Sequence, residues 1–216
     1  MSKKIHTYPG KEVDVQWDGR LCIHIGECGR AAGDLFEGGR QPWCQPDVTT
    51  ADDVVDVVNR CPTGALTYER KDGGPGATAA AENTVVVANN GPLYLSGELE
   101  IAGAAEDMNG VKLRAALCRC GESKNKPFCD NSHEKVGFVD RGAVGQTGSP
   151  LENTGGCLKV GKAPNGPLLV NGNFKIVSGS GRVAWEGTRA ALCRCGKSKN
   201  KPFCDGAHKP AGFTAE

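Results

Sequence analysis

Two short stretches of this chain carry the same metal-ligating residue types at the same spacing. Each reads C-x-C, eight further residues, Cys, three further residues and His, and the second begins 75 residues after the first (193 − 118). The candidate ligands are Cys118, Cys120, Cys129 and His133 in the first stretch and Cys193, Cys195, Cys204 and His208 in the second. Three thiols and one imidazole within sixteen residues are typical of a metal site. The sequence therefore predicts two metal centres of the same design.

The ligand spacing favours iron over zinc. Structural zinc sites usually leave two to four residues between paired cysteines, whereas C-x-C brings two thiolates close together. Cys129 and His133 could then hold a second iron, which gives a [2Fe–2S] cluster with three Cys ligands and one His ligand. The alternative is a zinc-stabilised Cys₃His binding module for nucleic acid or protein. Lys+Arg 26 against Asp+Glu 25 argues against a polyanion partner, so we expect no nucleic-acid binding.

Both stretches resemble the CDGSH motif of the NEET (mitoNEET-like) iron–sulfur proteins, C-x-C-x₂-[ST]-x₃-P-x-C-D-G-[STA]-H. The matching positions besides the first two cysteines are Ser123, Pro127, Cys129, Asp130 and His133, and Ser198, Pro202, Cys204, Asp205, Gly206 and His208. The resemblance implies a [2Fe–2S] cluster in each copy. Asn131 stands where the family has Gly, and Asn tolerates a positive φ well enough for the turn to survive. We expect Asp130 and Asp205 to accept hydrogen bonds that order the loops.

The repeat extends beyond the ligand loops, because residues 90–138 align with 165–213 without a gap. Alternating apolar residues and Asn-Gly or Ser-Gly turns predict strands in both copies. The predicted strands are 85–87, 93–95, 98–101, 158–160, 168–170 and 174–177, and a short helix is expected after each ligand loop. Few strands per copy cannot bury a face alone. NEET proteins are homodimers, so the resemblance implies a monomer whose two copies pair by pseudo-two-fold symmetry into a β-sandwich.

The N-terminal segment resembles a divergent single-cluster ferredoxin domain. Cys22, Cys28 and the Cys61-Pro62 pair fall on the first, third and fourth ligand positions of the bacterial ferredoxin pattern. Ile25 occupies the second position and cannot bind iron, so counting donors favours a [3Fe–4S] cluster. The alternative is a [4Fe–4S] cluster completed by Cys44, by His24 or by an exogenous ligand. We interpret Cys44 as an inert thiol and His24 as a surface residue beside the cluster.

The predicted fold is α+β, with a ferredoxin-like unit followed by a β-rich tandem unit. In the first unit we expect a strand over 13–17, a helix over 30–36, a helix from Thr50 to Arg60 and a short strand after Cys61. The predicted divisions are a ferredoxin-like domain 1–70, a linker 71–83, a first repeat 84–138, a connector 139–156 and a second repeat 157–216. Cys157 has no counterpart in the first repeat, and we expect it to be a core thiol.

Eleven cysteines in ligand spacings indicate a reducing compartment rather than a disulfide scaffold. The N-terminus has no apolar segment typical of a signal peptide, and no apolar run approaches the length of a membrane span. We therefore expect a bacterial cytoplasmic protein without membrane contact.

No catalytic motif stands out, so we expect an electron or cluster carrier rather than an enzyme. The alternative role is a redox or iron sensor, and the acceptor protein is unknown. Residues 124–128 and 199–203 each combine two lysines with a phenylalanine. These stretches are either solvated faces or docking patches for an acidic redox partner, with RNA binding a third interpretation.

Overall fold

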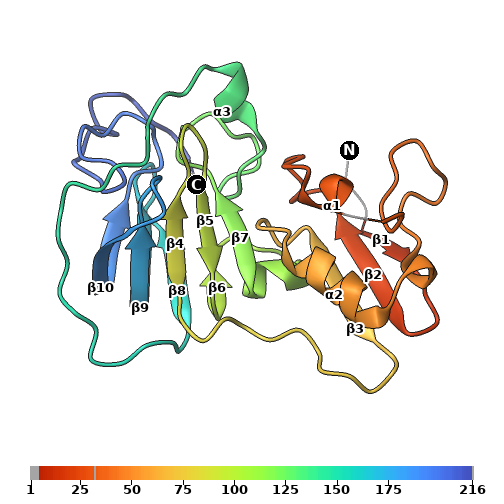
Figure 1. Cartoon of the computed structure of the whole chain (residues 1–216). Coiled ribbons are helices and arrows are strands. Elements are labelled where there is room, and N and C mark those ends of the chain that lie inside the picture. Colours follow the sequence, from red (N-terminus) through yellow and green to blue (C-terminus); the bar gives the residue numbers. More distant parts are fainter. Residues whose placement is uncertain (1–4, 32, 216) are drawn as a thin grey trace.

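The computed structural model describes residues 5–31 and 33–215 and arranges them as a small N-terminal unit beside a larger sheet (Figure 1). The N-terminal unit is an antiparallel sheet of order β1-β2-β3 with α2 packed on it. Its elements are β1 (Ile5–Tyr8), β2 (Val13–Asp18), α1 (Glu27–Arg30), η1 (Pro46–Val48), α2 (Ala51–Asn59) and β3 (Leu66–Arg70). The chain is strand-rich with few helices, in agreement with the α+β prediction.

Helix α2 has both a capping residue at its start and an apolar face along its length. The Thr50 hydroxyl accepts a 3.2 Å hydrogen bond from the Asp53 amide, which satisfies one of the free N–H groups of the first turn. Val54, Val57 and Val58 form its buried face. The predicted helix from Thr50 to Arg60 is therefore confirmed, apart from its capping residues.

The prediction of a helix over 30–36 is wrong. Helix α1 covers Glu27–Arg30, and Ala31 after it is already extended. Phe36 forms an antiparallel bridge with Cys44, so the chain must be extended where the apolar residues suggested a helical turn.

The larger sheet has seven strands in the order β6-β8-β9-β4-β5-β7, and β10 also pairs with β9. They are β4 (Thr84–Val87), β5 (Leu93–Ser96), β6 (Leu99–Ile101), β7 (Arg114–Leu117), β8 (Leu158–Lys162), β9 (Leu168–Val177) and β10 (Val183–Leu192). The predicted strands are present, although 168–170 and 174–177 join into the single strand β9. Strands β1, β7 and β10 were not predicted.

The two repeats exchange strands with matching register. Strand β6 of the first repeat pairs in parallel with β8 of the second, with Glu100 opposite Lys159. Strand β9 of the second repeat pairs in parallel with β4 of the first, with Lys175 opposite Thr84. Adding 75 to Glu100 and subtracting 75 from Lys159 converts one pair into the other. Each repeat therefore pairs one of its strands with the other repeat in the same way.

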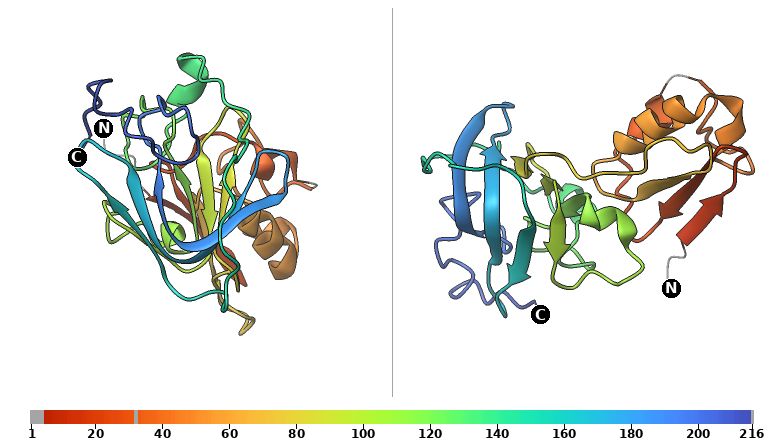
Figure 2. Two further views of the ribbon diagram at one scale, coloured as in Figure 1. Left: turned by 90° about the vertical axis from the view of Figure 1, so that its left-hand side faces the viewer. Right: turned by 90° about the horizontal axis from the view of Figure 1, so that it is seen from below.

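The repeats differ where the N-terminal unit docks. The first repeat forms the 3₁₀ helix η2 (Asn109–Lys112) at positions that match the start of β10 in the second. Figure 2 shows η2 between the large sheet and the N-terminal unit. A Cβ atom added to Gly110 would lie 1.9 Å from the carbonyl oxygen of Gly64, so the two backbones are in contact. Leu21 and Ala65 of the N-terminal unit complete the core of the large sheet.

The expected short helix after each ligand loop forms only in the first repeat. It is α3 (Ser132–Lys135), whereas residues 206–212 of the second repeat form turns. Pro210 stands at the position that matches Lys135. Proline lacks an amide hydrogen and disfavours a helical conformation of the residue before it. No helix in the described part of the chain is long and apolar enough to cross a membrane.

Candidate metal centres

Each ligand loop begins where a strand of the large sheet ends. Strand β7 runs directly into Cys118 and β10 into Cys193, so both loops lie at the same end of the sheet (Figure 1). The Cys118 amide donates to the carbonyl of Pro127, and the Cys129 amide donates to that of Ala116, each at 2.9 Å. The second loop repeats both bonds at 2.7 and 2.8 Å. These bonds fold each loop back onto its strand and bring distant ligands together.

The four donors of each loop form two close pairs. The sulfurs of Cys118 and Cys120 are 3.8 Å apart, and the Cys129 sulfur is 3.4 Å from Nδ1 of His133. The matching distances in the second loop are also 3.8 and 3.4 Å. Metal–ligand bonds of about 2.3 Å to sulfur and about 2.0 Å to nitrogen separate two tetrahedral ligands by roughly 3.5–3.8 Å. Each pair is thus spaced like two ligands of one ion.

The pairs do not converge on a common point. Within residues 5–31 and 33–215, no three Cys, His, Asp or Glu side chains are arranged to hold a single ion. A mononuclear zinc site would require all four donors around one centre. Two separate two-donor pairs instead suit a two-iron cluster, which takes two protein ligands on each iron.

Carboxylates order both loops as predicted. Asp130 accepts hydrogen bonds from the amides of Lys124 at 2.8 Å and Ser132 at 3.0 Å. Asp205 accepts the matching bonds at 2.8 and 3.0 Å. Hydrogen bonds from the Lys199 and Ala207 amides hold the pKa of Asp205 below its usual value. Asn131 adopts a φ of 70°, close to the 86° of Gly206, so the Asn for Gly replacement preserves the turn.

Backbone amides also point at the ligand sulfurs. The Glu122 amide lies 3.5 Å from the Cys120 sulfur, and the Asn131 amide lies 3.4 Å from the Cys129 sulfur. The second loop has the same contacts at 3.5 and 3.4 Å. Such bonds stabilise negative charge on sulfur and tune a bound cluster.

Burial makes the thiolates of Cys129 and Cys193 costly without a cation. It raises the pKa of Cys129 to about 12 and that of Cys193 to about 11. A hydrogen bond from Cys120 lowers the pKa of Cys118 to about 6 and correspondingly raises that of Cys120. Metal binding would supply the positive charge that these sites need to hold deprotonated sulfur.

Two arginines that sequence reasoning missed support the loops. Arg119 and Arg194 occupy the middle of each C-x-C, and each is only 1% exposed. Their Nε atoms donate at 2.9 Å to the carbonyls of Gly91 and Gly166. Their matching positions, each opposite an Asn-Gly-Pro-Leu turn, are the signal that could have identified them. A buried guanidinium beside thiolate ligands offsets their negative charge.

The two ligand loops contact each other through matching glycines. A Cβ atom on Gly121 would lie 2.6 Å from the carbonyl oxygen of Cys195, and one on Gly196 would lie 2.3 Å from that of Cys120. Both glycines have a positive φ, of 93° and 75°. In addition, the Lys126 and Lys201 ammonium groups lie over phenylalanine rings of the opposite repeat, Phe213 at 5.8 Å and Phe138 at 6.0 Å respectively.

The N-terminal unit brings its three predicted ligands to one cavity. Cys22 follows β2, Cys28 lies in α1 and Cys61 follows α2, and all three line a cavity of about 440 Å³. Burial raises the pKa of Cys28, and the nearby Cys61 and Cys22 add to the effect. Three thiols around a cavity fit the ligand set of an iron–sulfur cluster.

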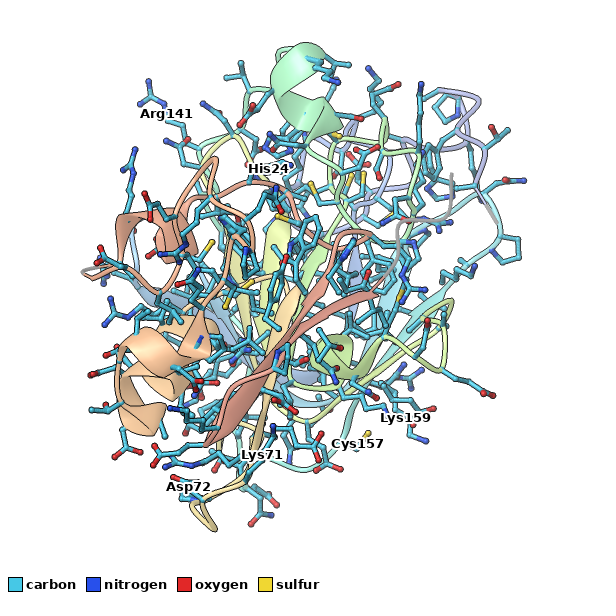
Figure 3. All side chains as sticks on the ribbon, turned by 90° about the vertical axis from the view of Figure 1, so that its right-hand side faces the viewer. His24, Lys71, Asp72, Arg141, Cys157 and Lys159 are labelled. Atoms are coloured by element: carbon cyan, nitrogen blue, oxygen red, sulfur yellow. The ribbon has the colours of Figure 1, made fainter. Side chains whose placement is uncertain are left out.

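The two open candidates for a fourth ligand differ in position. His24 lines the same cavity, with Nδ1 4.0 Å from the Cys22 sulfur, and adopts a left-handed φ of 55°. Ile25 also lines the cavity but offers no donor atom. Cys44 is fully buried in the core between sheet and helix and does not line the cavity. Burial raises its pKa to about 12, as expected for an inert thiol. Figure 3 shows His24 at the end of the molecule that carries α3.

The expectation of an exposed aromatic side chain in the lysine-rich stretches needs correction. Phe128 and Phe203 are buried in the core, so the lysine-rich stretches do not present an aromatic side chain for docking or base stacking. Lys126 and Lys201 donate internally, to the carbonyls of Ser123 and Ser198 at 2.6 Å.

Cys157 is not a core thiol. It is partly exposed, 3.9 Å from a Glu100 carboxylate oxygen, at the opposite end of the molecule from His24 (Figure 3).

Comparison with known proteins agrees with both halves of this description. Residues 8–71 match the family model described as a divergent 4Fe-4S mono-cluster. Residues 90–134 and 165–209 each match the model described as an iron-binding zinc finger of CDGSH type. The uncharacterized protein YjdI of Escherichia coli strain K12, and that of strain O157:H7, are each 42% identical over 64 residues. That match covers 30% of this chain and 84% of each relative. No solved structure matches the chain.

Proposed function

Since this chain belongs to the divergent 4Fe-4S mono-cluster family through its N-terminal unit and carries two CDGSH iron-binding units after it, we propose that it holds three iron–sulfur clusters and transfers electrons or clusters. The observation that carries the proposal is the pairing of donors in both CDGSH loops, at 3.8 and 3.4 Å. We propose a carrier rather than an enzyme, working with a redox or cluster-acceptor protein in a reducing compartment of a bacterial cell.

In each CDGSH loop the C-x-C cysteines would hold one iron of a [2Fe–2S] cluster, and the third cysteine with the histidine would hold the other. When bound, such a cluster accepts and releases single electrons, at a higher potential than an all-cysteine cluster because imidazole replaces one thiolate. The amides at the ligand sulfurs and the buried arginines stabilise the anionic ligand set.

For the N-terminal site, three cysteines account for a [3Fe–4S] cluster, and this is the type we propose. His24 is the residue that could complete a [4Fe–4S] cluster, because it alone of the two earlier candidates lines the cavity. Replacing His24 with Ala should leave the spectrum of a three-iron cluster unchanged. Conversion of a four-iron spectrum into a three-iron spectrum by H24A would show instead that His24 is a ligand.

We further propose that the chain is a monomer with the architecture of an internal dimer. The support is the strand exchange between the repeats, in which both parallel pairs have the same register. Light scattering on the cluster-loaded protein should give the mass of a single chain. A mass of two chains would contradict this part of the proposal.

Two assays separate electron transfer from cluster transfer. The reduced protein is mixed with oxidised cytochrome c, whose absorbance reports electron acceptance. In parallel, the oxidised protein is mixed with metal-free plant-type ferredoxin, whose own spectrum reports receipt of a cluster. An electron carrier reduces cytochrome c and keeps its iron, whereas a cluster donor loses iron to the ferredoxin. Failure of both assays with a fully loaded protein would favour the sensor role.

A further inference from the structure

The N-terminal metal site is built into the interface with the first CDGSH repeat. Cys22 and Cys61 both pack against the buried core of the large sheet, and their neighbours Leu21 and Ala65 belong to that core. Gly64, next to Ala65, contacts Gly110 of η2. A cluster held by these cysteines would therefore lie against the unit formed by the two repeats, and not on the outer surface of the N-terminal unit.

Ile23 is the side chain between the two ligand sets. It follows the ligand Cys22 directly, is 4% exposed and packs with Ala116 and Cys129, the third cysteine of the first CDGSH loop. Tyr94 covers the same contact. One aliphatic side chain thus separates a ligand residue of the N-terminal site from a ligand of the first CDGSH site and excludes water between them.

A hydrogen bond also joins the first CDGSH loop to the segment that precedes Cys22. The Asn125 side-chain amide, in the first CDGSH loop, donates to the carbonyl of Arg20 at 2.8 Å. The matching residue of the second loop, Asn200, has no side-chain hydrogen bond within residues 5–31 and 33–215. Likewise Ala116 is buried against Ile23, whereas its counterpart Ala191 is only half-buried. The contact breaks the symmetry of two otherwise matching loops.

We propose that Ile23 couples the N-terminal site to the first CDGSH site alone, by sealing Cys129 from water and holding the two sites one side chain apart. The proposal rests on the proposed function, because it requires both sites to hold clusters. Its consequence is that two similar CDGSH sites behave differently. The first is protected by, and electronically paired with, the N-terminal site, and the second stands apart from it.

The test is the rate of cluster loss to an iron chelator in Ile23→Asn, followed by visible absorbance and EPR. The polar side chain should admit water to Cys129, so the first CDGSH cluster should be lost faster while the second is lost at its wild-type rate. A Cys204→Ser background, which removes a ligand of the second site, assigns the two phases. Val54→Ala is the matched control, since Val54 is buried in the N-terminal core away from Ile23.

Wild-type rates at both sites, or equal acceleration of both, would overturn the proposal. A second readout does not depend on chelator access. When the N-terminal centre is paramagnetic, it should shorten the spin relaxation of the first CDGSH centre much more than that of the second. Equal relaxation of the two centres would also overturn the coupling. Absence of iron from the wild-type protein would instead defeat the proposed function, so the two failures are distinguishable.

Discussion

The histidine ligands are the residues at which the two CDGSH sites are chemically most sensitive. His133 is buried, at 8% exposure, whereas His208 is only half-buried. Burial lowers the pKa of His133, so its protonation requires a lower pH than that of an ordinary imidazole. A ligating imidazole must stay deprotonated at the bound nitrogen. We therefore expect acid to release the second cluster before the first.

Replacing the histidine ligands tests this sensitivity. His133→Cys and His208→Cys should each slow the acid loss of the cluster at the substituted site, because a bound thiolate does not protonate near neutral pH as readily as imidazole. The measurement is the rate of absorbance loss at pH 5, 6 and 7 for each variant. Loss rates that are equal in wild type and variants across this range would contradict imidazole ligation.

Asp140 provides a test at a residue outside the ligand set. Its carboxylate pairs with the fully buried side chain of Arg119, while position 215 of the second repeat is Ala. Burial alone would raise the pKa of Asp140, but the Arg119 and Gly142 hydrogen bonds hold it below its usual value. Asp140→Ala should lower the free energy of unfolding by about 1–3 kcal/mol at pH 7, since it removes a partner of a buried charge.

The pH dependence of this effect follows from the sign of the shift. A lowered pKa stabilises the folded state above the unfolded pKa of about 3.9, and the gain is lost as the pH falls through the folded value. The difference between wild type and variant in urea unfolding should thus persist from pH 7 to 5. Asp56→Ala, which breaks an exposed pair with Arg60, is the control and should cost less than about 0.5 kcal/mol.

The grouping of the candidate ligands was predictable because cysteine and histidine spacing is a local property of the sequence. The eight CDGSH donors and the three N-terminal cysteines each gather where the sequence placed them. The burial of Arg119 and Arg194 does not follow from their residue type, and only their recurrence at matching positions of the two repeats signals a shared role. Whether His24 or Cys44 lines the cavity also depends on tertiary packing, which the sequence does not encode locally.

At the scale of elements, the contact between the two ligand loops is the feature most open to test. Gly121→Ala should perturb both CDGSH sites, because its Cβ would press on the carbonyl of Cys195. Gly137→Ala is the matched control, since Gly137 also has a positive φ, of 61°, but a Cβ there meets nothing within 4 Å.

The two variants should differ in the free energy of unfolding. Strain at a positive φ should cost about 1 kcal/mol in both, and overpacking should cost Gly121→Ala roughly 1–3 kcal/mol more. Urea unfolding with absorbance of the clusters measures the difference. Equal stability of the two variants, with unchanged spectra, would contradict contact between the loops.

Most strands were predictable from alternation, and the exceptions have physical causes. Strand β7 is Arg-Ala-Ala-Leu, whose last three residues are all buried, so it shows no alternation. In strand β10 the register against β9 shifts between Gly187 and Arg189. This irregularity interrupts the alternation of apolar residues, so the sequence did not indicate a strand there. The exchange of strands between repeats depends on pairing partners far apart in the chain, which local patterns cannot specify.

At the scale of the whole molecule, docking of the N-terminal unit depends on the Gly64 and Gly110 contact. Gly110→Val should separate the two units, because even a Cβ atom would lie 1.9 Å from the Gly64 carbonyl oxygen. Undocking should expose the linker 71–83 to limited proteolysis and enlarge the radius of gyration in small-angle scattering. Gly76→Ala is the control, since its Cβ would meet nothing within 4 Å. Equal scattering curves for the two variants would contradict this docking contact.

The central claim is that the chain carries iron–sulfur clusters at three sites, and one measurement tests it most directly. Protein purified without oxygen is analysed for iron, sulfide and zinc, and its EPR spectrum is recorded as isolated and after dithionite. The proposal predicts iron and sulfide in similar amounts, a near-isotropic signal close to the free-electron g value in the oxidised sample, and two [2Fe–2S] signals after reduction. Zinc without sulfide at the CDGSH sites would contradict it.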